Sequence, residues 1–303
     1  MAITNMRYKF PFTTKAKVLV VMLAMSSMCL VTGPQVDALT SSTKGLTVSP
    51  LRNEVEISPG TSLERILKVT NSTDKTVQVT FSAEEFNVIN QAYDYAFFSA
   101  TDVTEWVSFS PKVVEIAPGK TENITYTIGV PLDAESGGRY FSLFTTADAG
   151  ENKNGVISRQ RVGSLVYLTV SGNVTRIGKL QSLAAPWITK SESEWSAVIG
   201  NSGTNHFRSR YNVEVQSLLR KSTISRTSGD ALILRSSVRL VTGELAAPKV
   251  PGIYRVVYTI GLGDTPSVRV VKYLVYVTPL AIIGLGIVFI LAGMVLVRLV
   301  SRR

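Results

Sequence analysis

The C-terminal end places the strongest constraint on this chain. From Leu280 to Val297, 18 consecutive residues carry no charge, and most are Leu, Ile, Val, Ala or Gly. At about 1.5 Å per residue, a helix of this length covers about 27 Å, close to the thickness of a bilayer's hydrocarbon core. Pro279 suits the first position of a helix, and the basic tail 298–303 is of the kind that stays in the cytoplasm. We predict a transmembrane helix over 279–297 in preference to a buried core helix.

A second apolar run lies near the N-terminus. Four basic residues precede the run 18–31, and the run is followed by Val36-Asp37-Ala38, whose first and third residues are small. This order is typical of a secretory signal peptide. We predict a signal peptide over 1–38 that is cleaved after Ala38, with an uncleaved anchor as the alternative. Residues 39–278 would then lie outside the cell, on a single-pass membrane protein whose C-terminus is in the cytoplasm.

Cysteine usage and length bound the exported part. The chain has a single cysteine, Cys29, which lies within the predicted signal peptide. An exported chain without a disulfide depends on core burial for its stability. The remaining roughly 240 residues suggest two domains of about 100–130 residues each, with one large β domain as the alternative. The missing disulfides favour a bacterial source.

Charge divides the exported part in two. Residues 39–174 contain 11 Lys and Arg against 15 Asp and Glu, whereas residues 175–278 contain 14 against 6. Basic charge near a bilayer favours anionic lipid head groups or anionic wall polymers. A solvated surface without a partner is the alternative.

Alternating apolar and polar residues predict an all-β fold. Val77, Val79 and Phe81 alternate with polar residues, and similar patterns cover 124–130, 211–216 and 254–260. A period of two with β-branched and aromatic residues indicates half-buried strands. Turns such as Pro59-Gly60 interrupt the pattern, which favours sandwiches over a parallel sheet. We predict two β-sandwich domains in tandem, 39–174 and 175–278, followed by the transmembrane helix.

An aromatic stretch between Glu84 and Trp106 lacks clean alternation. Tyrosine and tryptophan rings provide large, rigid contact area, so the stretch is a candidate recognition loop. The alternative is that the rings fill one end of the sandwich core. The candidate binding residues are Tyr93, Tyr95, Phe97 and Phe98.

Catalytic patterns are missing from the sequence. His206 is the only histidine and so the only candidate base for a hydrolase triad, but it lies in a turn-like stretch and no Gly-x-Ser-x-Gly motif is present. A structural histidine is the better interpretation. Asp133 and Glu135 could contribute to a calcium site, but without an EF-hand pattern a charged loop is the better interpretation. No zinc-ligand cluster, phosphate-binding loop or nucleic-acid module occurs. We predict a protein that is not an enzyme, with no cofactor, no metal and no nucleic-acid partner.

Several short motifs occur in an order that resembles a known family. They are Ile57-Ser58-Pro59-Gly60 with Val69-Thr70-Asn71, Glu115-Ile116-Ala117-Pro118-Gly119 with Val130-Pro131, Gly138-Arg139-Tyr140, the segment 201–206, and Gly252-Ile253-Tyr254. With the signal, the C-terminal span and the basic tail, the chain resembles the WxL-interacting proteins of bacterial cell surfaces, and more distantly pilus-chaperone-type sandwiches. The resemblance implies immunoglobulin-like domains, with peptidoglycan bound by the first and a surface protein or host ligand by the second.

The predicted function is therefore that of a membrane-anchored extracellular binding or scaffold protein. Its partner would be a cell-wall polymer (peptidoglycan) or another surface protein, with the lipid bilayer contacted through Leu280 to Val297. The alternative is an accessory subunit of a membrane complex, in which the span makes the contact.

Overall fold

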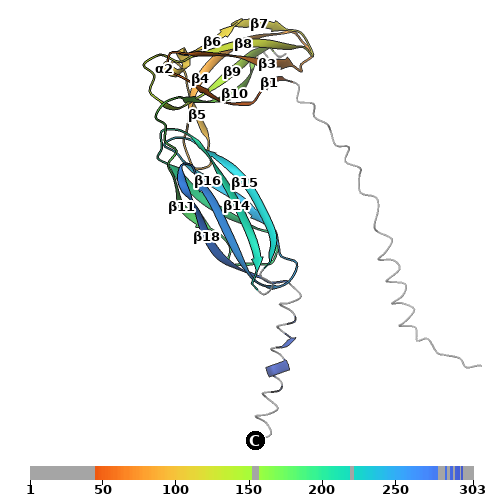
Figure 1. The fold of residues 1–303 in the computed structure, drawn as a ribbon. Helices are drawn as coiled ribbons and strands as arrows, with labels where there is room; N and C mark the ends of the chain where they lie inside the picture. The colour runs from red at the N-terminus through yellow and green to blue at the C-terminus, as the bar shows by residue number, and fades with distance from the viewer. Residues whose placement is uncertain are drawn as a thin grey trace, which may run out of the picture. The chain divides into compact units, whose positions relative to one another are not determined.

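The computed structural model describes residues 45–151, 157–218 and 222–278, together with 284, 287–288, 291–293 and 295 (Figure 1). The predicted signal peptide, 1–38, lies outside the described residues, as does most of the predicted span, 279–297. Those residues of the span that are described have helical conformation. Across the described part of the chain, no helix has the length and hydropathy needed to cross a bilayer. The transmembrane helix stays a prediction.

The strands from Leu46 to Val170 form two sheets. One sheet has the order β1-β3-β8-β6 and the other β2-β10-β9-β4-β5, with β7 paired to β4. A single short helix, α2, precedes β6 in this part of the described chain. The elements are β1 (Leu46–Ser49), β2 (Arg52–Ile57), β3 (Ser62–Asn71), β4 (Val77–Val88), β5 (Tyr95–Phe98), α2 (Asp102–Glu105), β6 (Val107–Ser110), β7 (Val113–Ile116), β8 (Thr121–Gly129), β9 (Gly137–Glu151) and β10 (Ile157–Val170).

The strands from Gly178 to Tyr276 form two further sheets. Their orders are β11-β13-β16 and β12-β18-β17-β14-β15. The elements are β11 (Gly178–Ala184), β12 (Ile188–Thr189), β13 (Ser193–Asn201), β14 (Phe207–Ser217), β15 (Thr223–Ile233), β16 (Val238–Leu245), β17 (Gly252–Leu262) and β18 (Thr265–Tyr276).

Both sets of strands are connected in the same way. In each, the first strand pairs antiparallel in one sheet (β1 with β3, β11 with β13), and the second pairs parallel with the last strand of the other sheet (β2 with β10, β12 with β18). The remaining pairs are antiparallel. Two mainly antiparallel sheets with this division of strands are typical of immunoglobulin-like sandwiches. The predicted all-β class is confirmed.

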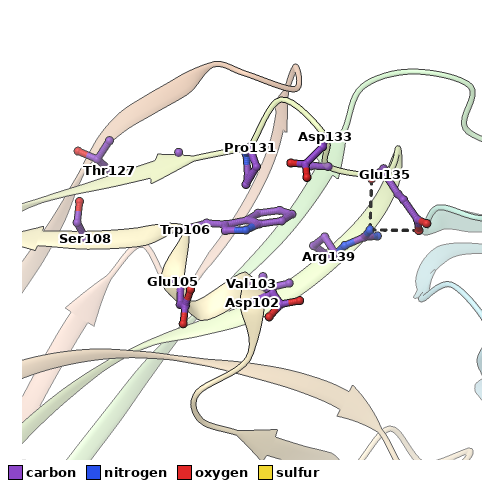
Figure 2. Close-up of a pocket in the computed structure, with 12 residues that line it drawn as sticks. Asp102, Val103, Glu105, Trp106, Ser108, Thr127, Pro131, Asp133, Glu135 and Arg139 are labelled. Carbon is purple, nitrogen blue, oxygen red and sulfur yellow. Dashed lines mark hydrogen bonds and ion pairs between the residues drawn. The ribbon is translucent and has the colours of Figure 1, made fainter.

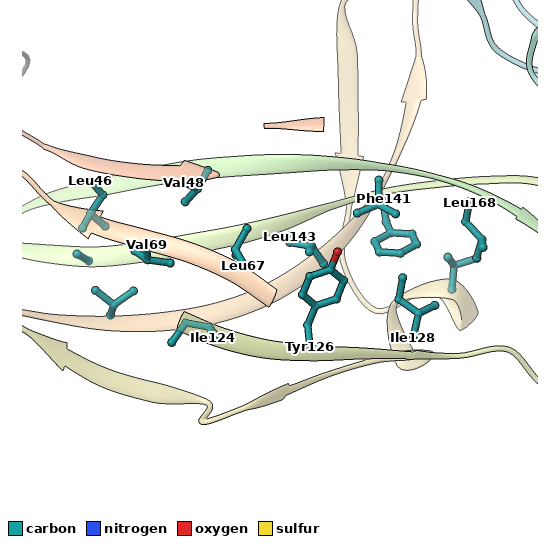
Figure 3. Packing of buried hydrophobic residues seen from close by; sticks show 14 of the residues in the cluster. Leu46, Val48, Leu67, Val69, Ile124, Tyr126, Ile128, Phe141, Leu143 and Leu168 are labelled. Atoms are coloured by element: carbon teal, nitrogen blue, oxygen red, sulfur yellow. The ribbon is translucent and has the colours of Figure 1, made fainter. Parts of the chain in front are cut away.

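Each sandwich buries the apolar residues that alternate along its strands. In β8, Ile124, Tyr126 and Ile128 are each no more than 1% exposed and point into the first core, with Phe141 and Leu143 of β9 in the opposing sheet (Figure 3). In the second core, Trp195 packs edge-on against Tyr211 and Tyr258, with ring centroids 5.1 and 5.5 Å away. The alternation therefore identified inward-facing residues because successive side chains of a strand point to opposite faces.

A buried asparagine closes one corner of the first sandwich. Asn71 ends β3, and its Nδ2 donates to the carbonyls of Lys75 and Ile116 at 2.7 and 2.9 Å. Its Oδ1 accepts from the N–H of Thr73 at 2.9 Å. The side chain thereby forms the turn that follows β3 and ties it to the end of β7.

The second sandwich has the same device. Asn201 ends β13, and its Nδ2 donates to the carbonyls of Asn205 and Leu234 at 2.8 and 3.0 Å. Its Oδ1 accepts from the N–H of Gly203 at 2.9 Å. Because these are buried backbone groups, each asparagine satisfies polar atoms that water does not reach.

Candidate functional site

A groove of about 800 Å³ opens on the first domain between α2, β6, β8 and the loop that follows β8 (Figure 2). Its lining combines one large aromatic ring with hydroxyl groups and an excess of carboxylates. The lining residues are Asp102, Val103, Glu105, Trp106, Ser108, Thr127, Gly129, Pro131, Asp133, Ala134, Glu135 and Arg139.

Trp106 is fixed at the centre of the groove by the end of α2. Val103 is buried in the first core and anchors the helix. The Trp106 N–H donates to the Val103 carbonyl at 3.3 Å, and the Trp106 carbonyl accepts from the N–H of Gly129 at 2.8 Å. Both bonds hold the backbone of Trp106 between α2 and β8, so the half-buried ring lies across the groove (Figure 2).

The opposite wall is the loop between β8 and β9. The N–H of Ala134 donates to the Pro131 carbonyl at 3.2 Å, which closes a tight turn. Asp133 and Glu135 flank Ala134, and both are exposed. Asp102 and Glu105 of α2 are likewise exposed on the other wall. Carboxylates therefore stand on both sides of the indole.

Arg139 is the one cation of the lining, and backbone groups occupy much of its guanidinium. It donates to the carbonyls of Gly138 and Glu135 at 3.1 and 3.3 Å, while the Glu135 carboxylate lies 3.9 Å away. Burial lowers the pKa of Arg139, and the nearby charge of Arg235 lowers it further. The Glu135 side chain is 91% exposed, so this ion pair is weakened by solvent. The groove keeps an excess of negative charge.

This arrangement suits a cationic group. An ammonium or guanidinium over the face of a tryptophan is attracted by the ring's negative π-face, and carboxylates accept charge-assisted hydrogen bonds from it. The hydroxyls of Ser108 and Thr127 add neutral donors and acceptors at one end. Within the described residues, no three side chains of the metal-binding types gather as a metal site would require.

The predicted aromatic binding residues separate into two environments. Tyr93 is 8% exposed, and its hydroxyl accepts from the N–H of Leu234 at 2.8 Å and contacts the Ser237 hydroxyl at 2.9 Å. Tyr93 thus lies in the junction with the second domain. Tyr95 is half-buried and packs edge-on against Phe86 at 4.9 Å. Tyr93 belongs to a buried cluster with Phe86, Tyr140 and Tyr167, and Tyr95 packs against this cluster.

Phe97 and Phe98 are more accessible. They are 39% and 45% exposed, and Phe97 packs edge-on against Phe144 at 5.1 Å. Neither phenylalanine lines the groove of Trp106. A binding role for Tyr93, Tyr95, Phe97 and Phe98 stays a prediction, and the groove draws on other residues.

His206 lies apart from the groove. It is 9% exposed, with ring centroids 5.6 Å from Tyr140 and 6.0 Å from Tyr167. Burial is the main cause that lowers its pKa to about 4. Its Nδ1 has no hydrogen-bond partner within the described residues. A neutral imidazole packed between two tyrosines agrees with a structural role.

Sequence patterns had marked parts of the groove without joining them. Asp133 and Glu135 stood out as a charged loop, and Trp106 ended the aromatic stretch. The pairing of β6 with β8, which sets Val107 opposite Ile128, brings these two segments together. Local periodicity shows which face a residue is on but not which distant strand lies beside it.

Comparison with known proteins yields structural likeness alone. No family model matches the chain, and no curated protein does. Among solved structures, a chaperone–tip adhesin complex of CFA/I fimbriae shares 11% identity at a TM-score of 0.40, over 75% of this chain and 98% of that chain. The class 5 fimbriae chaperone CfaA shares 10% identity at a TM-score of 0.39, over 75% and 99%. The CupB2 chaperone of Pseudomonas aeruginosa shares 14% at 0.33, over 75% and 98%.

Proposed function

We propose that this chain is a non-enzymatic binding protein, anchored in the membrane of a bacterium, whose first domain holds a positively charged segment of another surface protein. The observation that carries the proposal is the groove in which Trp106 lies between carboxylates on two walls. The predicted signal peptide and span, and the resemblance to WxL-interacting proteins, support the location outside the cell.

The charge of the groove lining determines which kind of partner segment it would bind. The groove lining holds more carboxylates than cations. The carboxylates are Asp102, Glu105, Asp133 and Glu135, and the one cation is Arg139. A lysine or arginine of the partner would stack on the indole, which contributes about 0.5–2 kcal/mol, and would donate to a carboxylate. An anionic partner would be repelled, because like charges disfavour close approach.

A wall polymer is the second candidate, and a different observation favours it. Residues 175–278 carry 14 Lys and Arg against 6 Asp and Glu. This excess would attract an anionic polymer to the second domain. The two candidates differ in where contact occurs, so one experiment separates them.

Site-specific photocrosslinking in intact cells tests the proposal. A benzoylphenylalanine at Ser108, which lines the groove and is exposed, would capture what occupies it, and one at the exposed Ser182 of β11 serves as the control. We expect a peptide adduct at position 108, rich in Lys or Arg by mass spectrometry. Trp106→Ala should reduce that adduct about tenfold, as loss of about 1.4 kcal/mol implies.

Three results would contradict the proposal. These are no adduct at position 108, equal adducts at 108 and 182, or an adduct that survives Trp106→Ala undiminished. A glycan adduct found at position 182 alone would support the wall polymer instead.

A further inference from the structure

Large apolar side chains are exposed at one end of the second domain. Trp187 is 72% exposed, Val250 58%, Ile253 56% and Leu218 43%. They come from three segments of the chain: Trp187 lies just before β12, Val250 and Ile253 lie around the start of β17, and Leu218 directly follows β14. We call these four residues the exit patch. Several exposed apolar residues grouped together indicate a surface with a partner.

Strand register shows that the patch lies where the chain leaves the domain. Val275 of β18 is opposite Ile188 on one side and Ile253 on the other. The N–H of Val275 donates to the Trp187 carbonyl at 2.8 Å. In the neighbouring pair of strands, β14 and β17, Ser217 is opposite Tyr254. Leu218, the next residue, therefore lies at the level of Ile253.

A cavity of about 510 Å³ lies within this end of the sandwich. It is lined mainly by apolar and small residues, among them Val215, Ile224, Val250, Ile253 and Tyr254. The Tyr254 hydroxyl donates to the Val250 carbonyl and so holds the loop before β17 in place. The exposed side chains of Val250 and Ile253 thus project from a fixed loop and strand.

We propose that the exit patch lies in the interfacial layer of the same bilayer that holds residues 280–297. This inference rests on the membrane anchor in the proposed function. Val275 is three residues before Thr278, the last residue of the described domain, so at most about 10 Å of extended chain separates the patch from that residue. The predicted span begins at the next residue, Pro279.

The chemistry of this end fits a lipid interface. Tryptophan favours the head-group level, where its ring contacts acyl chains and its N–H remains hydrated. Lys249 directly precedes Val250 and Lys190 is three residues after Trp187, and both lysines are exposed. Their ammonium groups can reach lipid phosphates while the side-chain stems stay on apolar surface.

Quenching of tryptophan fluorescence by brominated lipids tests the inference on the full chain in nanodiscs of phosphatidylcholine and phosphatidylglycerol. The chain has three tryptophans, Trp106, Trp187 and Trp195, so the emission of Trp187 is the difference between the wild type and Trp187→Phe. We expect bromines near the head groups to quench this difference at least twofold, and bromines deep in the acyl chains to quench it less. Trp106→Phe is the matched control, and the quenched component should persist in it.

Two failures are distinguishable. If the chain elutes with the nanodiscs and the Trp187 emission is unquenched, the inference is wrong while the anchor stands, and the patch would then face a protein. If the chain does not elute with the nanodiscs, the anchor fails and the inference fails with it. Val250→Ser combined with Ile253→Ser gives a second check, because this pair should lower the quenching of Trp187 in inserted protein.

Discussion

His206 is a buried base in a protein with no other histidine. Burial lowers its pKa from 6.5 to about 4, while the negative charge of Glu54 acts in the opposite direction. The rings of Tyr140 and Tyr167 lie beside it, and they belong to β9 and β10 of the first domain. The imidazole is therefore a small neutral component of a mostly aromatic contact between the domains.

Acid should destabilise the fold through His206. The unfolded chain takes up a proton near pH 6.5, whereas the folded chain does so only near pH 4. This contribution to stability is complete above pH 6.5 and is lost as the pH falls to about 4, by about 3 kcal/mol in all. Urea denaturation of the wild type at pH 7 and at pH 4.5 measures the loss, and His206→Gln should show a smaller one.

Carboxylates also titrate in this range, so the comparison with His206→Gln isolates the histidine. Because the protein has a single histidine, its imidazole Cε1–H resonance is unambiguous, and the midpoint of its titration should lie near pH 4 in the folded protein. A midpoint near 6.5, or equal acid losses in the two proteins, would show that the imidazole is not held neutral by burial.

The two asparagine corners determine how the strands of each sandwich meet. Asn71 is fully buried and Asn201 is 4% exposed, and each joins the end of one strand to a carbonyl of a distant element. Apolar packing alone leaves such carbonyls without donors. The side-chain amide supplies donors that the turn backbone cannot.

Replacing Asn201 should therefore destabilise the second domain strongly. Asn201→Ala removes the donor to the carbonyls of Asn205 and Leu234 and the acceptor for the N–H of Gly203. Leaving buried backbone groups unpaired costs about 1–3 kcal/mol each, so we expect a loss of about 3 kcal/mol. Urea denaturation at pH 7 measures it.

Asn123 provides the control at this scale. It is exposed near the start of β8, and Asn123→Ala should change the free energy of unfolding by less than about 0.5 kcal/mol. Similar values for the two variants would mean that the buried amide contributes nothing specific to the corner.

Sequence reasoning succeeded where structure is local. The alternation in β8 and β17 predicted which residues face inward, and Pro59-Gly60 was correctly identified as a turn. It could not place Tyr93, because a tyrosine in an irregular stretch carries no sign of whether it meets solvent or another domain. The groove escaped for the same reason, since Trp106 and Asp133 come together through strand pairing between distant segments.

Contacts between the two domains extend along several segments. The N–H of Gly138 donates to the Thr204 carbonyl at 2.9 Å, and the N–H of Arg235 donates to the Tyr140 hydroxyl at 3.1 Å. Phe86, Tyr93, Tyr140 and Tyr167 also form one buried cluster with Leu232 and Leu234. A junction with buried apolar area and backbone hydrogen bonds restricts relative motion more than a polar linker does.

The orientation of the chain in the membrane determines whether the two sandwiches lie outside the cell, as a surface protein requires. If 279–297 spans the membrane with the basic tail 298–303 inside, both sandwiches are outside. Protease added to intact, wall-digested cells should then remove epitopes placed in exposed loops of either domain, for example at Asp74 or Asp264. An epitope after Arg303 should survive until the cells are lysed, because the bilayer shields it. Protection of the domain epitopes in intact cells, together with digestion of the C-terminal epitope, would reverse the orientation and remove the proposed partners from reach.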